Sequence, residues 1–280
     1  MTFVNVCNLT ETNGRCFEGR LYDKYENSCV YIRKTYYFCA VLFCVQAFAD
    51  EPDSIVGGTD ADLGEFPHQV SLQIYGEHYC GGSLITNKHV LTAAHCAEDF
   101  QNMVSAITVM SGSNSLKKGG QSHKVKRFII HDDYIGKNVR IVVNDIAVIE
   151  LEAPIVPNAY QQPITIGNYP AEMSVAYISG WGQLSAGGDI PTILKKARVY
   201  VLSNAECQKR VGPYDKIASS NICVLYRPGV GACSGDSGGP LTYEGQLVGV
   251  ASMAYPCALG KPDIYVRPSD YMDFITKAIA

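Results

Sequence analysis

The segment Val70-Ser71-Leu72-Gln73-Ile74-Tyr75 alternates apolar and polar residues at a period of two. Such alternation is typical of a β-strand with one buried face and one face toward water. Similar short apolar runs recur outward from it, separated by clusters of glycine, proline, asparagine or lysine. These runs occupy residues 83–85, 106–110, 125–130, 146–151, 198–202 and 247–252. Many short strands with turn residues between them predict an all-β fold.

Helical patterns are confined to two short segments. One helix is predicted near the C-terminus, where Ser269 is the candidate cap. The residues predicted to share its buried face are Met272, Ile275 and Ile279. A shorter helix is predicted over residues 203–210, and the proline-rich segment 154–163 is the candidate crossover between two halves of the body.

The composition is that of a packed globular protein. The 280 residues are 47% hydrophobic and 18% charged, and the formal net charge is -4. This balance lacks the basic footprint of a nucleic-acid-binding protein, so we expect neither nucleic acid nor another polyanion as a partner. The 11 cysteines favour an oxidising compartment or a metal site over an ordinary cytosolic enzyme.

Residues 33–49 have the layout of a secretory signal peptide. A basic flank, Arg33-Lys34, precedes an apolar run that ends in Ala47-Phe48-Ala49. About 14 apolar residues rise only about 21 Å as a helix, which is short of the roughly 30 Å hydrocarbon core and disfavours a membrane anchor. Residues 1–32 precede this signal and are interpreted either as a small extension or as a product of start-site assignment.

The cysteine count supports a mature body that starts near residue 55. Removing residues 1–54 takes away five of the 11 cysteines and leaves an even set of six. These are Cys80, Cys96, Cys207, Cys223, Cys233 and Cys257. Six cysteines allow 15 pairings, and their order alone selects none of them.

Gly235-Asp236-Ser237-Gly238-Gly239 places a serine among glycines, which permit tight turns and let a substrate approach main-chain N–H groups. The pattern suits an acyl-transfer nucleophile, although such a pentapeptide can also be an ordinary surface turn. It matches the G-x-S-x-G nucleophile elbow, but that elbow requires a histidine after the serine. All six histidines lie between residues 68 and 131, so a base must come from upstream.

Two upstream segments offer the partners of such a serine. In Thr92-Ala93-Ala94-His95-Cys96, small neighbours leave room around the imidazole, although a core histidine is the simpler interpretation. In Asn144-Asp145-Ile146-Ala147-Val148, a carboxylate stands at the head of an apolar strand, where burial would require a hydrogen-bonded partner. Capping a turn is the ordinary role of such an aspartate.

Taken together, these segments resemble the chymotrypsin family of serine proteases. Among its members, the overall resemblance is to the insect chymotrypsins. Further matching motifs are Ile55-Val56-Gly57-Gly58, Ser179-Gly180-Trp181-Gly182 and 233–240, so the resemblance covers residues 55–280. It implies two six-stranded antiparallel β-barrels with a C-terminal α-helix and an active site in the cleft between the barrels. It also implies three disulfides: Cys80–Cys96, Cys207–Cys223 and Cys233–Cys257.

The resemblance implies a role for each candidate site residue. Ser237 would be the nucleophile, His95 the general base and Asp145 the residue that orients the imidazole, with Ser252 hydrogen-bonded to Asp145. The N–H groups of Gly235 and Ser237 would form the oxyanion hole.

The resemblance also implies activation by a cut between Ser54 and Ile55. The new α-amino group of Ile55 would then pair with Asp236, and residues 50–54 would be a propeptide. Family members usually carry arginine or lysine before this cut, so Ser54 argues against a trypsin-like activator.

Substrate preference depends on the residues that match the family's primary pocket. Gly231, with Ala232 beside it, stands where trypsins have an aspartate, which predicts an apolar or aromatic residue before the cut bond. Ala254 and Asp263 replace two glycines of the pocket wall. If Asp263 faces the substrate, large aromatics lose room and basic side chains gain a weak attraction; if it turns toward water or a neighbour, the chymotrypsin-like preference survives, and we favour this second arrangement.

We expect no cofactor and no metal. Zinc on Cys80, His89, His95 and Cys96 is disfavoured because adjacent residues are awkward joint ligands, and residues 110–127 lack the carboxylates of a calcium site. The expected protein is a secreted, extracellular monomer without membrane contact after signal removal, with protein and peptide substrates and protein inhibitors as partners. The alternatives are a membrane-tethered protease and a catalytically idle homologue that serves as a binding protein.

Overall fold

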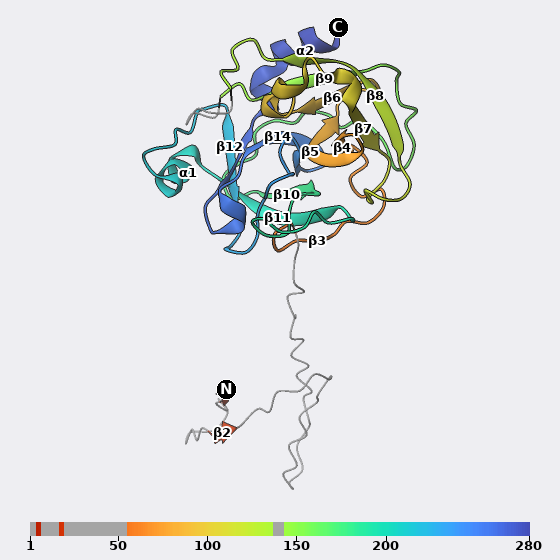
Figure 1. The fold of residues 1–280 in the computed structure, drawn as a ribbon. Helices are drawn as coiled ribbons and strands as arrows, with labels where there is room; N and C mark the ends of the chain where they lie inside the picture. Colours follow the sequence, from red (N-terminus) through yellow and green to blue (C-terminus); the bar gives the residue numbers. More distant parts are fainter. Residues whose placement is uncertain (1–3, 7–16, 20–54, 137–142) are drawn as a thin grey trace. The chain divides into compact units, whose positions relative to one another are not determined.

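The computed structural model describes residues 4–6, 17–19, 55–136 and 143–280 (Figure 1). The chain divides into two compact units, Met1–Phe48 and Ala49–Ala280. In the first unit the described residues pair β1 (Val4–Val6) with β2 (Phe17–Gly19). The predicted signal peptide at 33–49 and propeptide at 50–54 lie outside the described residues. No helix in the described part of the chain is both long and apolar enough to cross a membrane.

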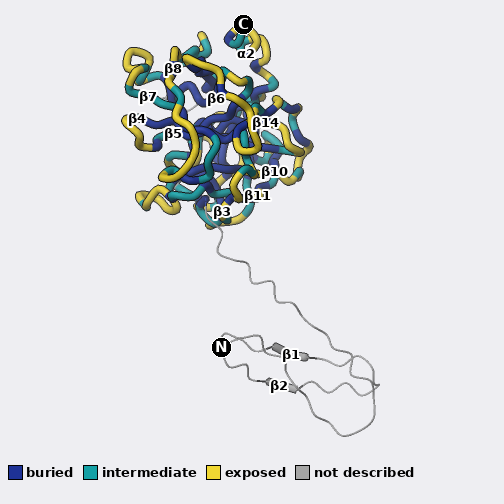
Figure 2. Tube along the Cα trace, turned by 90° about the vertical axis from the view of Figure 1, so that its right-hand side faces the viewer, coloured by how far each residue is buried: buried dark blue, intermediate teal, exposed yellow. Residues whose placement is uncertain are grey.

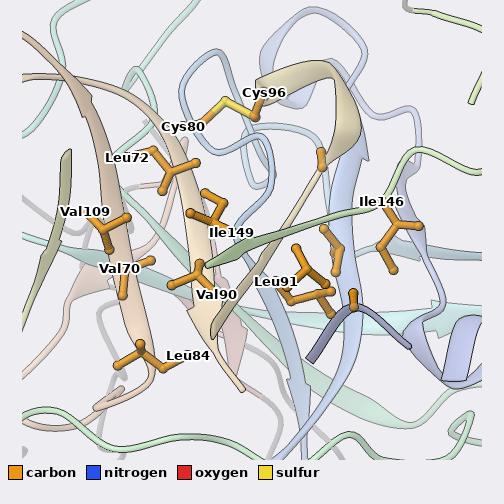
Figure 3. Close-up of a cluster of buried hydrophobic side chains, with 14 of the residues drawn as sticks. Val70, Leu72, Cys80, Leu84, Val90, Leu91, Cys96, Val109, Ile146 and Ile149 are labelled. Carbon is orange, nitrogen blue, oxygen red and sulfur yellow. A yellow bond between two sulfur atoms is a disulfide. The ribbon is translucent and has the colours of Figure 1, made fainter. Parts of the chain in front are cut away.

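Six antiparallel strands close into a first barrel in the order β4-β5-β6-β9-β8-β7. Their bounds are Gln69–Ile74 (β4), Glu77–Leu84 (β5), His89–Thr92 (β6), Ile107–Ser111 (β7), Gln121–Ile130 (β8) and Ala147–Leu151 (β9). Buried aliphatic side chains from all of these strands fill the barrel, and the Cys80–Cys96 disulfide borders them (Figure 3). Since closure leaves no free sheet edge, the barrel is a rigid support for the turns at its ends.

The second barrel contains β10, β13, β14, β15, β12 and β11, and the pairing of β10 with β11 closes it. Their bounds are Val175–Gly180 (β10), Lys195–Leu202 (β11), Asn221–Leu225 (β12), Pro240–Tyr243 (β13), Gln246–Met253 (β14) and Asp263–Val266 (β15). The short strand β3 (Thr59–Asp60) adds to the edge of β11. The two-barrel fold is therefore confirmed, and the connection between β9 and β10 contains the segment 154–163.

The expectation that β4 exposes one face is wrong. Val70 and Leu72 are buried as predicted, but Ser71 and Gln73 on the other face are buried too. The neighbouring Gln69 accepts a hydrogen bond through its Oε1 from Ser179 of the second barrel at 2.7 Å. The dark central strands of Figure 2 show that much of the sheet surface is covered on both sides. Strands β6, β12 and β15 were missed for the same reason, because a strand buried on both faces does not alternate.

The two predicted helices are present, with one correction. Ser203 caps α1 (Asn204–Val211) by accepting a hydrogen bond from the N–H of Glu206. The C-terminal α2 (Met272–Ile279) instead follows a 3-10 turn, Pro268–Tyr271, so Ser269 lies inside helical backbone and is not its cap. The predicted buried face is also partly wrong, because Met272 is 42% exposed while Ile275 is buried.

Candidate active site

The register of the first barrel brings His95 and Asp145 together. Strands β6 and β9 are antiparallel, and Thr92 lies opposite Ala147. Residues just after Thr92 therefore share one end of the barrel with residues just before Ala147. His95 stands on the 3-10 turn Ala94–Cys96 that follows β6, and Asp145 stands two residues before β9.

Asp145 holds His95 at two atoms. Its Oδ2 lies 2.8 Å from His95 Nδ1, and its Oδ1 accepts the main-chain N–H of His95 at 2.9 Å. Ser252 Oγ of β14 donates a further hydrogen bond to Oδ2, so the second barrel reaches into the same cluster. Burial alone would raise the pKa of Asp145, but the bonds from His95 and Ser252 outweigh it and hold the pKa below its usual value.

Ser237 lies on a tight turn in which two nearby glycines have positive φ values. Gly235 and Gly238 have φ values of 99° and 75°, which favour glycine. A Cβ atom on Gly238 would lie 2.1 Å from Thr92 Oγ1 and 2.6 Å from the carbonyl oxygen of Gly81. The N–H of Gly81 donates to the carbonyl of Ser237 at 2.7 Å. The turn is therefore packed directly against the strands that lead to His95.

The two predicted oxyanion donors are available to a ligand. Within the described residues, neither the N–H of Gly235 nor that of Ser237 donates a hydrogen bond to the protein. The peptide between these two donors is anchored by His78, whose Nε2 lies 3.0 Å from the carbonyl oxygen of Gly235. His78 Nδ1 in turn lies 2.8 Å from Ser71 Oγ.

Sequence reasoning missed His78 and Ser71. Burial lowers the pKa of His78 to about 4, so the ring is neutral at physiological pH. A neutral ring has one donor and one acceptor nitrogen, which matches a donation to the Gly235 carbonyl and an acceptance from Ser71. The available signal was a histidine two residues before Cys80, but a pairing between residues 157 positions apart is invisible to local patterns.

Asp236 and Ile55 line the same closely packed region of the second barrel. Ile55 is 1% exposed, and Asp236 accepts main-chain N–H groups from Gly182 at 2.7 Å and from Cys233 at 2.9 Å. Burial raises the pKa of Asp236 to about 6 in spite of these two hydrogen bonds. A carboxylate in this environment is a favourable site for a cation.

The predicted pocket residues gather beside Ser237. Ala232, Ser252, Ala254 and Asp263 line one narrow pocket together with Ser237. Asp263 is buried in its wall and accepts the N–H of Ala232 through Oδ2 at 2.7 Å. Gly231 lies against this carboxyl, since a Cβ atom there would approach Oδ2 to 2.8 Å.

The protonation of Asp263 follows from its surroundings. Burial, aided by the negative charge of Asp236, raises the pKa of Asp263 to about 8, while the hydrogen bond from Ala232 opposes this rise. The pocket wall therefore carries a carboxyl group that is mostly neutral at pH 7 and ionises in the mildly alkaline range.

The three disulfides have the implied pairing. They join Cys80 to Cys96, Cys207 to Cys223 and Cys233 to Cys257. Cys80, His95 and Cys96 lie close enough together to suggest a metal site, but the two sulfurs are bonded to each other and cannot act as thiolate ligands. His89 lies elsewhere, at the start of β6, with Nδ1 2.8 Å from Thr86 Oγ1.

Comparison with known proteins agrees with this arrangement. Residues 55–275 match the family model described as trypsin. Trypsin alpha-4 of Lucilia cuprina is 38% identical over 80% of this chain and 87% of its own. Trypsin beta of Drosophila erecta is 37% identical over 79% and 87%, and chymotrypsin-2 of Vespa crabro is 35% identical over 80% and 99%. With this fold, these disulfides and these relatives, the chain belongs to the trypsin family of serine proteases.

Proposed function

We propose that residues 55–280 hydrolyse internal peptide bonds through an acyl-enzyme on Ser237. The observation that carries this proposal is the double hold of Asp145 on His95, next to a turn whose two N–H groups are unused within the described residues. An idle homologue that serves as a binding protein would have no need of either feature.

The geometry supports a definite role for each group. Because His95 Nδ1 faces Asp145, that nitrogen carries the proton and Nε2 is the one that can act as a base. His95 takes the proton of Ser237 as Oγ attacks the substrate carbonyl, and it later donates this proton to the leaving amine. The N–H groups of Gly235 and Ser237 stabilise the oxyanion, each by about 3 kcal/mol. Water then repeats the sequence and releases the acid from Ser237.

Covalent labelling tests this proposal. An organophosphate should add one phosphoryl group to Ser237 in the mature protein, and peptide mass mapping should locate it there. Ser237→Ala should remain unlabelled and inactive, while Ser234→Ala, an exposed serine of the same loop, should react normally. Failure of the mature wild-type protein to react would favour the idle homologue.

Activation by proteolysis is the second part of the proposal. A cut between Ser54 and Ile55 would create an ammonium group on Ile55, which packs in the same buried region as the Asp236 carboxylate. An α-amine titrates near pH 8, and pairing with Asp236 raises its pKa above that value. The active conformation therefore requires a pH above the pKa of Asp236, which the ammonium lowers, and below the raised pKa of the amine, and it is lost as the pH rises through the latter.

The site of the cut can be checked directly. Amino-terminal sequencing of secreted, active protein should begin at Ile55. The predicted export signal at 33–49 and the three disulfides support a secreted, extracellular protein, and a different first residue in active material would contradict this scheme.

The third part concerns the residue before the cut bond. Two of the three relatives are named trypsin and one chymotrypsin, so their names weigh toward a basic residue before the cut bond. Asp263 binds a neighbour, Ala232, but also lines the pocket, which favours an altered preference over an ordinary chymotrypsin-like one. We propose that apolar side chains of moderate size are accepted at neutral pH and that lysine and arginine gain as Asp263 ionises. A panel of peptides that differ only at this residue, cleaved by wild-type and Asp263→Gly protein, tests this preference.

A further inference from the structure

Three cations surround one carboxylate on the outside of the first barrel. Lys88 Nζ and Lys126 Nζ lie 2.9 Å and 2.8 Å from Glu150 Oε1, and Arg127 Nε lies 2.6 Å from Oε2. Successive strand residues normally point to opposite faces, but a register shift between Val125 and Arg127 lets Lys126 and Arg127 reach the same carboxylate. Glu150 compensates only one of the three charges.

Three more lysines extend this cluster along the chain. Lys124 lies on the same side of β8 as Lys126, because Val125 between them is buried. Lys117 and Lys118 belong to the loop that leads into β8. All three are exposed and form no ion pair with any residue that the structure describes. Five of the ten β8 residues are exposed, and only Val125 is buried (Figure 2).

The loop that carries Lys117 and Lys118 is held in place by its own hydrogen bonds. Ser113 Oγ donates to the carbonyl oxygen of Lys118 at 2.7 Å, and the carbonyl oxygen of Ser115 lies 3.1 Å from the same hydroxyl. Gly119 and Gly120, with φ values of 71° and 75°, complete the turn into β8. The two lysines are thus presented on an ordered turn. We call the whole set the β8 basic face, which comprises Lys88, Lys117, Lys118, Lys124, Lys126 and Arg127.

The β8 basic face has a strong net positive charge. The carboxylates on the adjacent β9 segment are Glu150 and Glu152, so six cations minus two anions leave a local charge of +4. Two histidines of these strands, His89 and His123, add no charge at neutral pH, because burial lowers the pKa of each. The whole chain carries -4, so its overall balance conceals this asymmetry. Our expectation that the protein binds no polyanion rested on that balance alone.

The residue types on this face select the class of partner. Interfaces with folded proteins are enriched in aromatic residues and arginine and depleted in lysine. Single-stranded nucleic acids need aromatic side chains for base stacking. Residues 110–127 contain five basic residues but neither an aromatic nor an acidic one. Such a surface suits a flexible polyanion that is held by charge and by release of counterions.

The disulfides indicate the compartment of the protein, and the compartment distinguishes sulfated polysaccharides from nucleic acids as partners. Three intrachain disulfides indicate an oxidising, extracytoplasmic compartment. The abundant flexible polyanions outside cells are sulfated polysaccharides, whereas nucleic acids are mainly intracellular. We propose that the β8 basic face binds a sulfated polysaccharide.

Retention on immobilised heparin, as a model sulfated polysaccharide, tests this proposal. The wild-type protein should be retained at 0.1 M salt, and the triple variant Lys117→Gln, Lys118→Gln, Lys124→Gln should bind about a hundredfold more weakly. The slope of log affinity against log salt should become shallower by about two to three in this variant. None of the three lysines pairs with Glu150, so the barrel should fold normally, and an unchanged melting temperature verifies this.

A charge-matched control variant distinguishes binding at the β8 basic face from a general attraction of heparin to any basic residue. The variant Lys209→Gln, Arg210→Gln, Lys216→Gln removes the same charge from α1 and the segment after it, on the second barrel. It should bind heparin within about threefold of the wild-type protein. Equal losses in the two variants, no retention of the wild-type protein at 0.1 M salt, or tighter binding to duplex DNA than to heparin would each overturn the proposal.

Discussion

Carboxyl groups that are equally buried in the two barrels have pKa values shifted in opposite directions. Asp145, Asp236 and Asp263 are 6%, 4% and 5% exposed. In the first barrel, Asp145 receives hydrogen bonds from the side chains of His95 and Ser252, and its pKa is lowered. In the second barrel, Asp236 and Asp263 receive only main-chain N–H groups from the residues that the structure describes, and their pKa values rise to about 6 and about 8.

The difference lies in the partners and not in the burial. Asp145 has its partners within the described chain, so its charge is stabilised before any substrate arrives. Asp236 and Asp263 lack a cationic side chain among the described residues that contact them, so each gains most from a cation supplied later. On our proposal, that cation is the ammonium of Ile55 for Asp236 and a basic substrate side chain for Asp263.

The largest expected effect comes from removing the negative charge of Asp145. Asp145→Asn should lower kcat by about 10⁴, because the amide stabilises the wrong imidazole tautomer and no longer supports the imidazolium. Steady-state kinetics on mature protein, with the melting temperature as a folding control, measures this effect. A variant that keeps a tenth of the wild-type kcat would show that Asp145 only caps its turn.

Removing the charge of Asp236 should have the next largest effect. In Asp236→Asn the ammonium of Ile55 would be buried without a counter-ion, which costs about 3–5 kcal/mol and so depopulates the active conformation by at least about a hundredfold. The measurement is kcat/KM of protein that sequencing shows to start at Ile55. Full activity of such protein would remove Asp236 from the activation scheme without affecting the role of Ser237.

A smaller loss of kcat is expected from replacing His78, whose hydrogen bond to Gly235 joins the two barrels. His78→Phe removes the support of the Gly235 carbonyl and should lower kcat about thirtyfold, less than the loss of a direct oxyanion donor. KM should change little, because the oxyanion forms only in the transition state. A change confined to KM would instead indicate a role in substrate binding.

The sequence predicted what depends on local pattern. Ser237 was identifiable because it stands among glycines, two of which have positive φ values in the structure, and Asp145 because a carboxylate heads an apolar strand. The disulfide pairing and the two-barrel fold came from the family resemblance, since six cysteines in order admit 15 pairings. Both are confirmed by the structure.

The remaining features depend on contacts that no local pattern contains. The His78–Gly235 bond joins different barrels, and the orientation of Asp263 depends on the N–H of Ala232, 31 residues away. The β8 basic face illustrates a third case, because its charges are visible in the sequence but were averaged into a net charge. The net charge of a whole chain does not show whether the fold brings its basic residues together on one surface.

The smallest expected effect concerns Asp263 and appears as a ratio. As pH rises from 6 to 9 the carboxyl ionises through about pH 8, so kcat/KM for a lysine substrate should rise about tenfold relative to a matched leucine substrate. The charge of Asp236 opposes this ionisation, and Ala232 N–H favours it. Using the ratio cancels the titration of His95 and the alkaline loss of the Ile55 ion pair, since both affect the two substrates equally.

Two variants make this test specific. Asp263→Asn retains an acceptor for the N–H of Ala232 but cannot ionise, so its lysine-to-leucine ratio should be flat over this range. Asp263→Gly should also give a flat ratio and should accept larger aromatic side chains, because the carboxyl no longer occupies the pocket wall. If the wild-type ratio were equally flat, the carboxyl would not face the substrate, and the chymotrypsin-like preference would stand. Asp263 would then resemble Asp145, because its carboxyl group would interact with other protein groups and not with the substrate.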